Sequence, residues 1–139
     1  MRISQFCLVI CLLGVMPMFG HARAEERNEI FRAVIAADGI QRIRVVGGSY
    51  FFKPDHIIVR VGVPVEFSAN LEPGIVPHTL VIDAPKAGIA IDATLGAEIK
   101  TFTFTPTIAG KYPFYCKNKL LFFESHSEKG MTGLLEVIE

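Results

Sequence analysis

Sulfur is scarce in this chain, and most of it lies at the start. The 139 residues include three cysteines and four methionines, and most of these fall within the first 24 positions. Beyond residue 24 the chain keeps one cysteine, Cys116, and one methionine, Met131. A single cysteine excludes an internal disulfide, which leaves an intermolecular bridge, an inert buried thiol, or a reactive or ligating thiolate.

The chain also lacks an excess of charge, an internal repeat, a low-complexity segment and a Gly/Ser/Pro-rich linker. Its 14 basic residues balance 14 acidic ones, and the basic residues form no stripe. This balance argues against nucleic acid as a partner. The absence of a linker indicates one domain, of a size that can bury a core.

The first 24 residues have the order of a secretory signal peptide. Arg2 precedes an apolar run from Ile3 to Phe19, and Ala22-x-Ala24 follows as a small-residue cleavage site. The alternative is an uncleaved membrane anchor, but polar residues and a proline interrupt the run, and it is short of the roughly 20 residues that a span needs. We therefore predict a signal peptide over 1–24 and a single periplasmic domain over 25–139, with no membrane span after cleavage.

From residue 40 onward, the apolar residues follow a period of two. HIIVRVGVPVEFSAN, at 56–70, places six apolar residues on one parity, with Gly62 and Pro64 marking a turn or an edge. KTFTFTPTIAGKYPFYC, at 100–116, repeats the pattern around a Pro-to-Gly turn. Three further strands are expected in QRIRVVGG, HTLVIDAP and GLLEVIE. Many short strands with frequent turns predict an all-β fold, an antiparallel β-sandwich.

Two segments are less regular. EERNEIFRAVIAADG, at 25–39, suits either a short helix or a strand. APKAGIAIDATLGAE, at 84–98, is expected to be a connection with a turn of helix.

Four residues offer metal ligands near predicted strand ends. His78 opens a strand, Cys116 ends one, His126 lies in the next loop, and Met131 opens the last strand. Each alone has an ordinary structural explanation. Together, one thiolate, two imidazoles and one thioether are the set of a trigonal copper site with a weak axial sulfur. Zinc rarely recruits methionine, and there is no second cysteine for a structural zinc site. His56 is expected to be a strand-turn residue rather than a ligand.

At these residues the sequence resembles the cupredoxins, small exported blue-copper proteins of the plastocyanin and azurin kind. The resemblance covers about residues 40–139 and includes FKPDHIIVRVGVPVEF, PHTL, FTPTIAGKYPFYC and HSEKGMTGLLEV. It implies a Greek-key sandwich with one copper ion per chain. It also implies that His78, Cys116 and His126 hold the copper, with Met131 as the axial ligand.

Two features depart from the family pattern. Nine residues separate Cys116 from His126, where the family's loops are usually shorter. Glu124 or Glu128 is therefore an alternative axial ligand to Met131, and it would lower the redox potential. The residue after the first histidine is Thr79 rather than the frequent asparagine, which predicts a weaker tie between the ligand loops.

Inside the long loop, Leu120–Phe123 form an apolar run. We expect these residues to fold back and cap the copper or extend the core. The alternative is an exposed patch that docks a redox partner protein or a second subunit as a homo-oligomer.

The predicted function is a single-electron carrier that alternates between Cu(I) and Cu(II), and not an enzyme. One alternative is a copper-binding protein for tolerance or delivery in the same compartment. Another is an open copper site that acts on a small molecule such as a nitrogen oxide. A metal-free binding sandwich would make the joint occurrence of the four ligands a coincidence.

Overall fold

The computed structural model describes residues 30–139, so the predicted signal peptide lies outside the described residues. The strands are β1 (Ile30–Arg32), β2 (Gln41–Gly48), β3 (Phe51–Lys53), β4 (His56–Arg60), β5 (Val65–Leu71), β6 (His78–Ala84), β7 (Ile89–Leu95), β8 (Lys100–Phe104), β9 (Gly110–Tyr115) and β10 (Thr132–Ile138). One 3-10 helix, η1 (Pro85–Ala87), lies between β6 and β7. In the described part of the chain, no helix is long and apolar enough to span a membrane.

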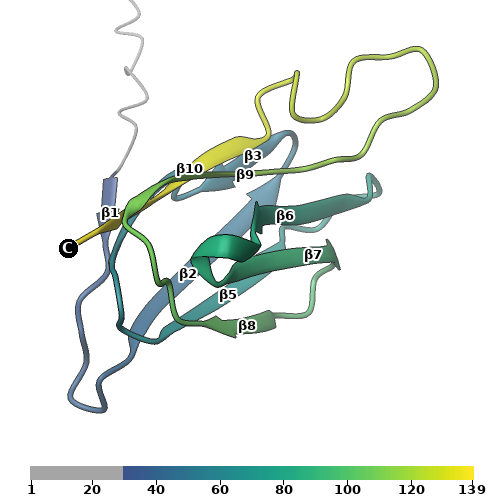
Figure 1. The fold of residues 1–139 in the computed structure, drawn as a ribbon. Helices are drawn as coiled ribbons and strands as arrows, with labels where there is room; N and C mark the ends of the chain where they lie inside the picture. Colours follow the sequence, from purple (N-terminus) through teal and green to yellow (C-terminus); the bar gives the residue numbers. More distant parts are fainter. Residues whose placement is uncertain (1–29) are drawn as a thin grey trace, which may run out of the picture.

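The strands form two sheets, which confirms the predicted β-sandwich (Figure 1). One sheet has the order β1-β4-β10-β9-β6-β7, and the other has the order β3-β2-β5-β8. Most neighbours are antiparallel, but β4 pairs in parallel with both β1 and β10, and β2 pairs in parallel with β5. Parallel pairs arise because the chain changes sheets between consecutive strands, so that neighbours within a sheet come from distant parts of the sequence.

The change of sheet is clearest in the long alternating segment at 56–70. β4 and β5 belong to different sheets, and the chain crosses between them in a turn where Gly62 has a φ of 73°. That positive φ is open to glycine without strain. Ile57 and Phe67 are fully buried on either side of the turn. One parity of the segment therefore faces the core from both sheets.

Aromatic side chains fill the space between the sheets. The Phe114 ring meets the Phe52 ring at 5.4 Å and the Phe67 ring at 6.2 Å, both edge to face. Such arrangements stabilise aromatic pairs beyond the area that they bury. Phe114 is fully buried two residues before Cys116, so the core fixes the end of β9 from which the cysteine emerges.

The two segments whose pattern was less regular, 25–39 and 84–98, both contain strands. Of residues 25–39, the described part includes a strand, β1, that pairs with β4. The prediction of a connection over 84–98 is wrong, because β7 pairs with β6 over seven residues there. The turn of helix expected within it is present as η1. In β7, Ile89, Ile91 and Leu95 face inward, but small alanines between them dilute the alternating pattern.

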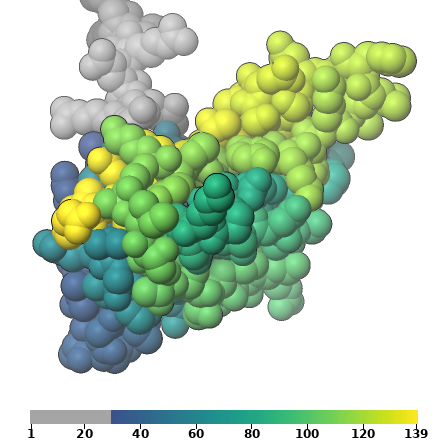
Figure 2. All heavy atoms as spheres, viewed as in Figure 1, coloured from purple at the N-terminus to yellow at the C-terminus, as the bar shows by residue number. Residues whose placement is uncertain are grey.

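Three neighbouring strands of the six-stranded sheet, β10, β9 and β6, have adjoining ends at one end of the sandwich. The end of β9 pairs with the beginning of β10 through Tyr115 and Thr132, and Tyr115 also pairs with Val81 of β6. The loop between β9 and β10 leaves the sheet at this end of the sandwich. Residues 117–125, called the arm below, extend away from the sandwich in yellow-green (Figures 1 and 2).

Candidate metal site

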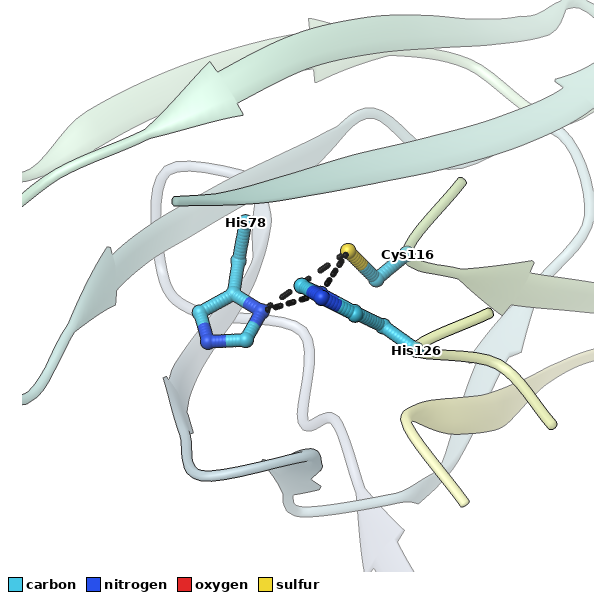
Figure 3. Close-up of side chains that lie close together, drawn as sticks. All are labelled: His78, Cys116 and His126. Carbon is cyan, nitrogen blue, oxygen red and sulfur yellow. Dashed lines mark hydrogen bonds between the residues drawn. The ribbon is translucent and has the colours of Figure 1, made fainter. Parts of the chain in front are cut away.

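Three of the predicted ligands come together at this end of the sandwich. His78 is the first residue of β6, Cys116 directly follows β9, and His126 directly follows the arm, at its base. Their side chains converge on one point (Figure 3). Among the described residues, they form the one group of histidine, cysteine and acidic side chains that could share a metal ion.

The distances within this group fit a single ion. The Cys116 Sγ lies 3.8 Å from the His78 Nδ1 and 3.5 Å from the His126 Nδ1, and the two Nδ1 atoms are 3.0 Å apart. Bonds of about 2.0 Å to nitrogen and 2.3 Å to sulfur place such donors roughly 3.3–3.8 Å from one another. The three side chains therefore already stand close to the spacing that a shared metal requires.

The cluster is shielded from water. Cys116 is fully buried, and His78 and His126 are 4% and 7% exposed. Burial lowers the pKa of His78, and the neighbouring His126 lowers it further. Burial likewise lowers the pKa of His126, with a second contribution from Lys129. Both imidazoles are thus neutral at neutral pH and keep a lone pair for a metal.

Met131 is fully buried, and its backbone is bonded to two residues of the cluster. Its backbone N–H donates to the His126 carbonyl at 3.0 Å, and its carbonyl accepts from the Cys116 N–H at 3.1 Å. Its terminal methyl packs near Gly47, where an added Cβ would stand 3.3 Å from it. The thioether is therefore held on the same short segment that carries His126.

The alternative axial carboxylates lie outside the cluster. The Glu128 carboxylate accepts from the backbone N–H and the hydroxyl of Ser125 at 2.6 and 2.7 Å, and the Ser125 Oγ accepts from the Glu128 N–H at 3.2 Å. This reciprocal arrangement is a capping box, and it lowers the pKa of Glu128. Glu124 is exposed on the arm. Neither carboxylate belongs to the cluster.

Thr79 and Asn118 fasten the loops that carry the ligands. The Thr79 N–H donates to the Cys116 Sγ at 3.3 Å, and the Thr79 Oγ1 accepts from the Lys117 N–H at 3.0 Å. The Asn118 side chain donates to the Pro77 carbonyl at 2.7 Å, and the Asn118 backbone carbonyl accepts from the His126 N–H at 2.9 Å. Threonine, which was expected to tie the loops more weakly than asparagine, makes a tie here through its side-chain oxygen. The sequence carried no signal for Asn118.

Tyr50 is a second residue that the sequence did not single out. Its ring meets the His126 ring edge to face at 5.0 Å and the His78 ring at 5.9 Å. The Lys129 ammonium stands 4.6 Å from the centre of the same ring. Tyr50 has a φ of 65°, an uncommon value for a residue with a side chain. It lies in the turn between β2 and β3 and supports both imidazoles from that side.

The arm does not cap the cluster, and the expectation that its apolar residues fold back is wrong. Leu120, Leu121, Phe122 and Phe123 are 63%, 75%, 100% and 63% exposed. A turn closed by the Phe123 N–H and the Leu120 carbonyl presents them, with Leu121 at a φ of 46°. The bond between His126 and Asn118 closes the base of the arm, so the residues between them project beyond the sandwich.

A half-open hollow lies between the arm and the loop before β6. Leu120 and Phe123 line one side of it, Ile75 and Val76 line the other, and His126 is part of its wall. Ile75 is also fully exposed. The surface beside His126 is therefore apolar, with Lys119, Glu124 and Lys129 as charged residues along the same hollow.

His56 takes no part in the cluster. Its Nε2 lies 2.9 Å from an Oε2 of Glu136, across the parallel pair of β4 and β10. Hydrogen bonding by His56 lowers the pKa of the Glu136 carboxyl. The histidine at the start of β4 is thus a structural partner of Glu136.

Comparison with known proteins places the chain in a family. No family model matches it. A chloroplastic plastocyanin of Oryza sativa subsp. indica is 31% identical over 136 residues, which cover 90% of this chain and 82% of that protein. Among solved structures, the metal-binding domain of the Streptococcus pneumoniae Cu(I)-exporting P-type ATPase CopA is 25% identical, with a TM-score of 0.61, and the match covers 81% of this chain and 98% of that one. An auracyanin of Roseiflexus castenholzii is 20% identical with a TM-score of 0.54 over 70% of this chain and 97% of its own, and it supports the fold alone.

The fold and the buried cysteine–histidine cluster are those of a small metal-binding β-sandwich. The chain belongs to the cupredoxins, the family that includes plastocyanin. Copper is the cofactor of this family, and its plastocyanin-like members are electron carriers, not enzymes. The donor set found here suits copper, since cysteine sulfur and imidazole nitrogen are both ligands that copper binds.

Proposed function

We propose that this chain is an exported, mononuclear copper protein that carries single electrons. The convergence of Cys116, His78 and His126 on one buried point supports the proposal. Copper would supply the one-electron couple between Cu(I) and Cu(II). The chain holds the three donors in place with ties at Thr79 and Asn118, so that little rearranges when the charge changes.

Met131 is the proposed axial ligand. Three observations support it: the residue is fully buried, its backbone is bonded to both Cys116 and His126, and the carboxylates of Glu124 and Glu128 lie outside the cluster. A thioether is the weak axial donor that such copper sites use. The predicted signal peptide over 1–24 supports export, with the periplasm as the proposed compartment and 25–139 as the exported domain.

A copper titration with a Met131→Leu variant tests the ligand set. Wild type is expected to bind one copper per chain with an intense thiolate-to-copper band, and to take up one electron per copper. Met131→Leu should keep the band and have a higher reduction potential, because a donor that stabilises Cu(II) is removed. Optical titration and potentiometry measure both properties.

Glu128→Gln is the matched control, because its carboxylate is exposed and bonded to Ser125. It should leave the potential unchanged. A large shift in this variant with none in Met131→Leu would assign the axial position to the carboxylate instead.

The likeness to the CopA metal-binding domain favours copper handling as a second candidate function. A handling protein must release its copper, whereas a carrier keeps it through many cycles. Rapid loss of copper to a competing chelator, in both oxidation states, would favour handling. Retention through repeated reduction and oxidation would favour electron transfer.

The arm and the hollow beside His126 form the proposed docking surface for a redox partner protein. Four large apolar side chains stand exposed on the arm, and Ile75 stands exposed across the hollow. Apolar surface of this extent marks interaction sites on soluble proteins. His126 forms part of the same hollow, so a partner seated there would approach the imidazole.

Electron self-exchange between copies of the protein tests this surface without an identified partner. A Phe122→Glu variant is expected to exchange roughly tenfold more slowly, because two like charges would meet when two such faces approach. NMR line broadening in mixtures of oxidised and reduced protein measures the rate. Ile108→Glu places the same charge on an exposed residue between β8 and β9 and should exchange at the wild-type rate. Equal slowing in both variants would contradict the assignment.

Sedimentation of the same proteins would show whether a second copy occupies the surface.

A further inference from the structure

The Thr79 side chain contacts the cysteine directly as well as tying the loops. Its Oγ1 lies 3.6 Å from the Cys116 Sγ and donates to it, and Thr79 is 5% exposed. The same oxygen accepts from the Lys117 N–H at 3.0 Å. A hydroxyl carries one hydrogen and two acceptor lone pairs. Because one lone pair is committed to Lys117, the rotation of the hydroxyl is restricted, and its hydrogen is directed to the sulfur.

The sulfur therefore receives two donors from one residue. The backbone N–H of Thr79 donates to the Cys116 Sγ at 3.3 Å, and the side-chain hydroxyl of Thr79 donates to it at 3.6 Å. The first of these bonds is available to any residue except proline. The second requires a hydroxyl at position 79, where the family often has asparagine. Both lie in a buried environment, where hydrogen bonds to charged groups are strongest.

We propose that Thr79 is a positioning residue that sets the reduction potential of the site through its hydroxyl. The inference rests on the proposed function. A thiolate that accepts a second hydrogen bond holds less negative charge for donation to copper. Weaker donation destabilises Cu(II) more than it destabilises Cu(I). The hydrogen bond therefore raises the reduction potential. Threonine at this position thus sets electron affinity and fastens the loops at once.

The test compares Thr79→Val with Thr79→Ser in the copper-loaded protein. Valine keeps the shape and the backbone N–H but removes the hydroxyl, whereas serine keeps both donors. Thr79→Val is expected to shift the Cu(II)/Cu(I) ratio at a given potential roughly tenfold toward Cu(II), which lowers the one-electron potential by about 59 mV. Its thiolate-to-copper band should move to longer wavelength. Thr79→Ser should restore both values to those of wild type.

Thermal unfolding of the metal-free proteins separates tuning from simple support. Thr79→Val also leaves the Lys117 N–H without its acceptor, so some loss of stability is expected. An unchanged potential and band in a less stable Thr79→Val protein would overturn the inference, because the hydroxyl would then serve the backbone alone. Thr79→Ala repeats the test if the valine variant does not fold. Absence of the band from wild type would instead reject the proposed function itself.

Discussion

Replacing Cys116 with serine is expected to abolish the thiolate-to-copper absorption band completely and leave the sandwich folded. Serine is close to cysteine in size, and its hydroxyl can still accept from the Thr79 N–H that now bonds the sulfur. It does not ionise at neutral pH, however, so the variant has no thiolate to transfer charge to copper. Visible absorption measures the band, and thermal unfolding of the metal-free protein measures the fold.

A His56→Gln variant is the matched control for the loss of a ligand. His56 contacts Glu136 on β10 and lies outside the cluster, so this variant should keep the full band at one copper per chain. Persistence of the band in Cys116→Ser would contradict the proposed site. Copper would then be bound elsewhere, and Cys116 would be an ordinary buried thiol.

Substituting alanine for Gly133 is expected to destabilise the fold by about 3 kcal/mol, because overpacked cores resist added atoms. Gly133 lies opposite Phe114 in the pair of β10 and β9, and the phenyl ring lies over it. A Cβ at this position would overlap the ring and approach the Asp55 backbone carbonyl to 2.7 Å. Phe114 is fully buried against other aromatic rings and cannot move aside. The melting temperature should fall on the order of 10 °C.

Gly96→Ala provides the comparison. A Cβ at Gly96 would meet no atom within 4 Å. The residue directly follows β7. Its melting temperature should remain close to that of wild type. Equal melting temperatures for the two variants would show that the phenyl ring has another position available and that the core near Cys116 is less rigid than its packing indicates.

The parts of the fold that the sequence predicted are those with strong local signals. Ile57 and Phe67 lie on one parity of a long alternating segment, and the turn between them contains glycine and proline. Cys116, His126 and Met131 are close in sequence, so their convergence needs one hairpin. His78 was predicted from its place at a strand start, and the pairing of β6 with β9 brings it to Cys116.

The missed parts depend on contacts that sequence patterns do not encode. Strand β7 exists because it covers β6, although small residues weaken its own pattern. The roles of Asn118 and Tyr50 follow from register across loops and sheets, and nothing next to them in the sequence indicates it. The apolar arm was expected to be buried on composition alone. Its exposure follows from the bond between His126 and Asn118, which closes its base.

That closure divides the segment between Cys116 and Met131 into two parts with separate tasks. Outside the closing bond, the chain is anchored to the sheet and to Pro77, and it holds the donors. Inside the bond, residues 119–124 take no part in that anchoring, whereas Ser125 fastens the following turn through Glu128. The length and composition of 119–124 can change without displacing a donor. The proposed recognition of a partner would thus rest mainly on residues that do not hold the donors, and it could be altered in evolution or by design while the metal site is preserved.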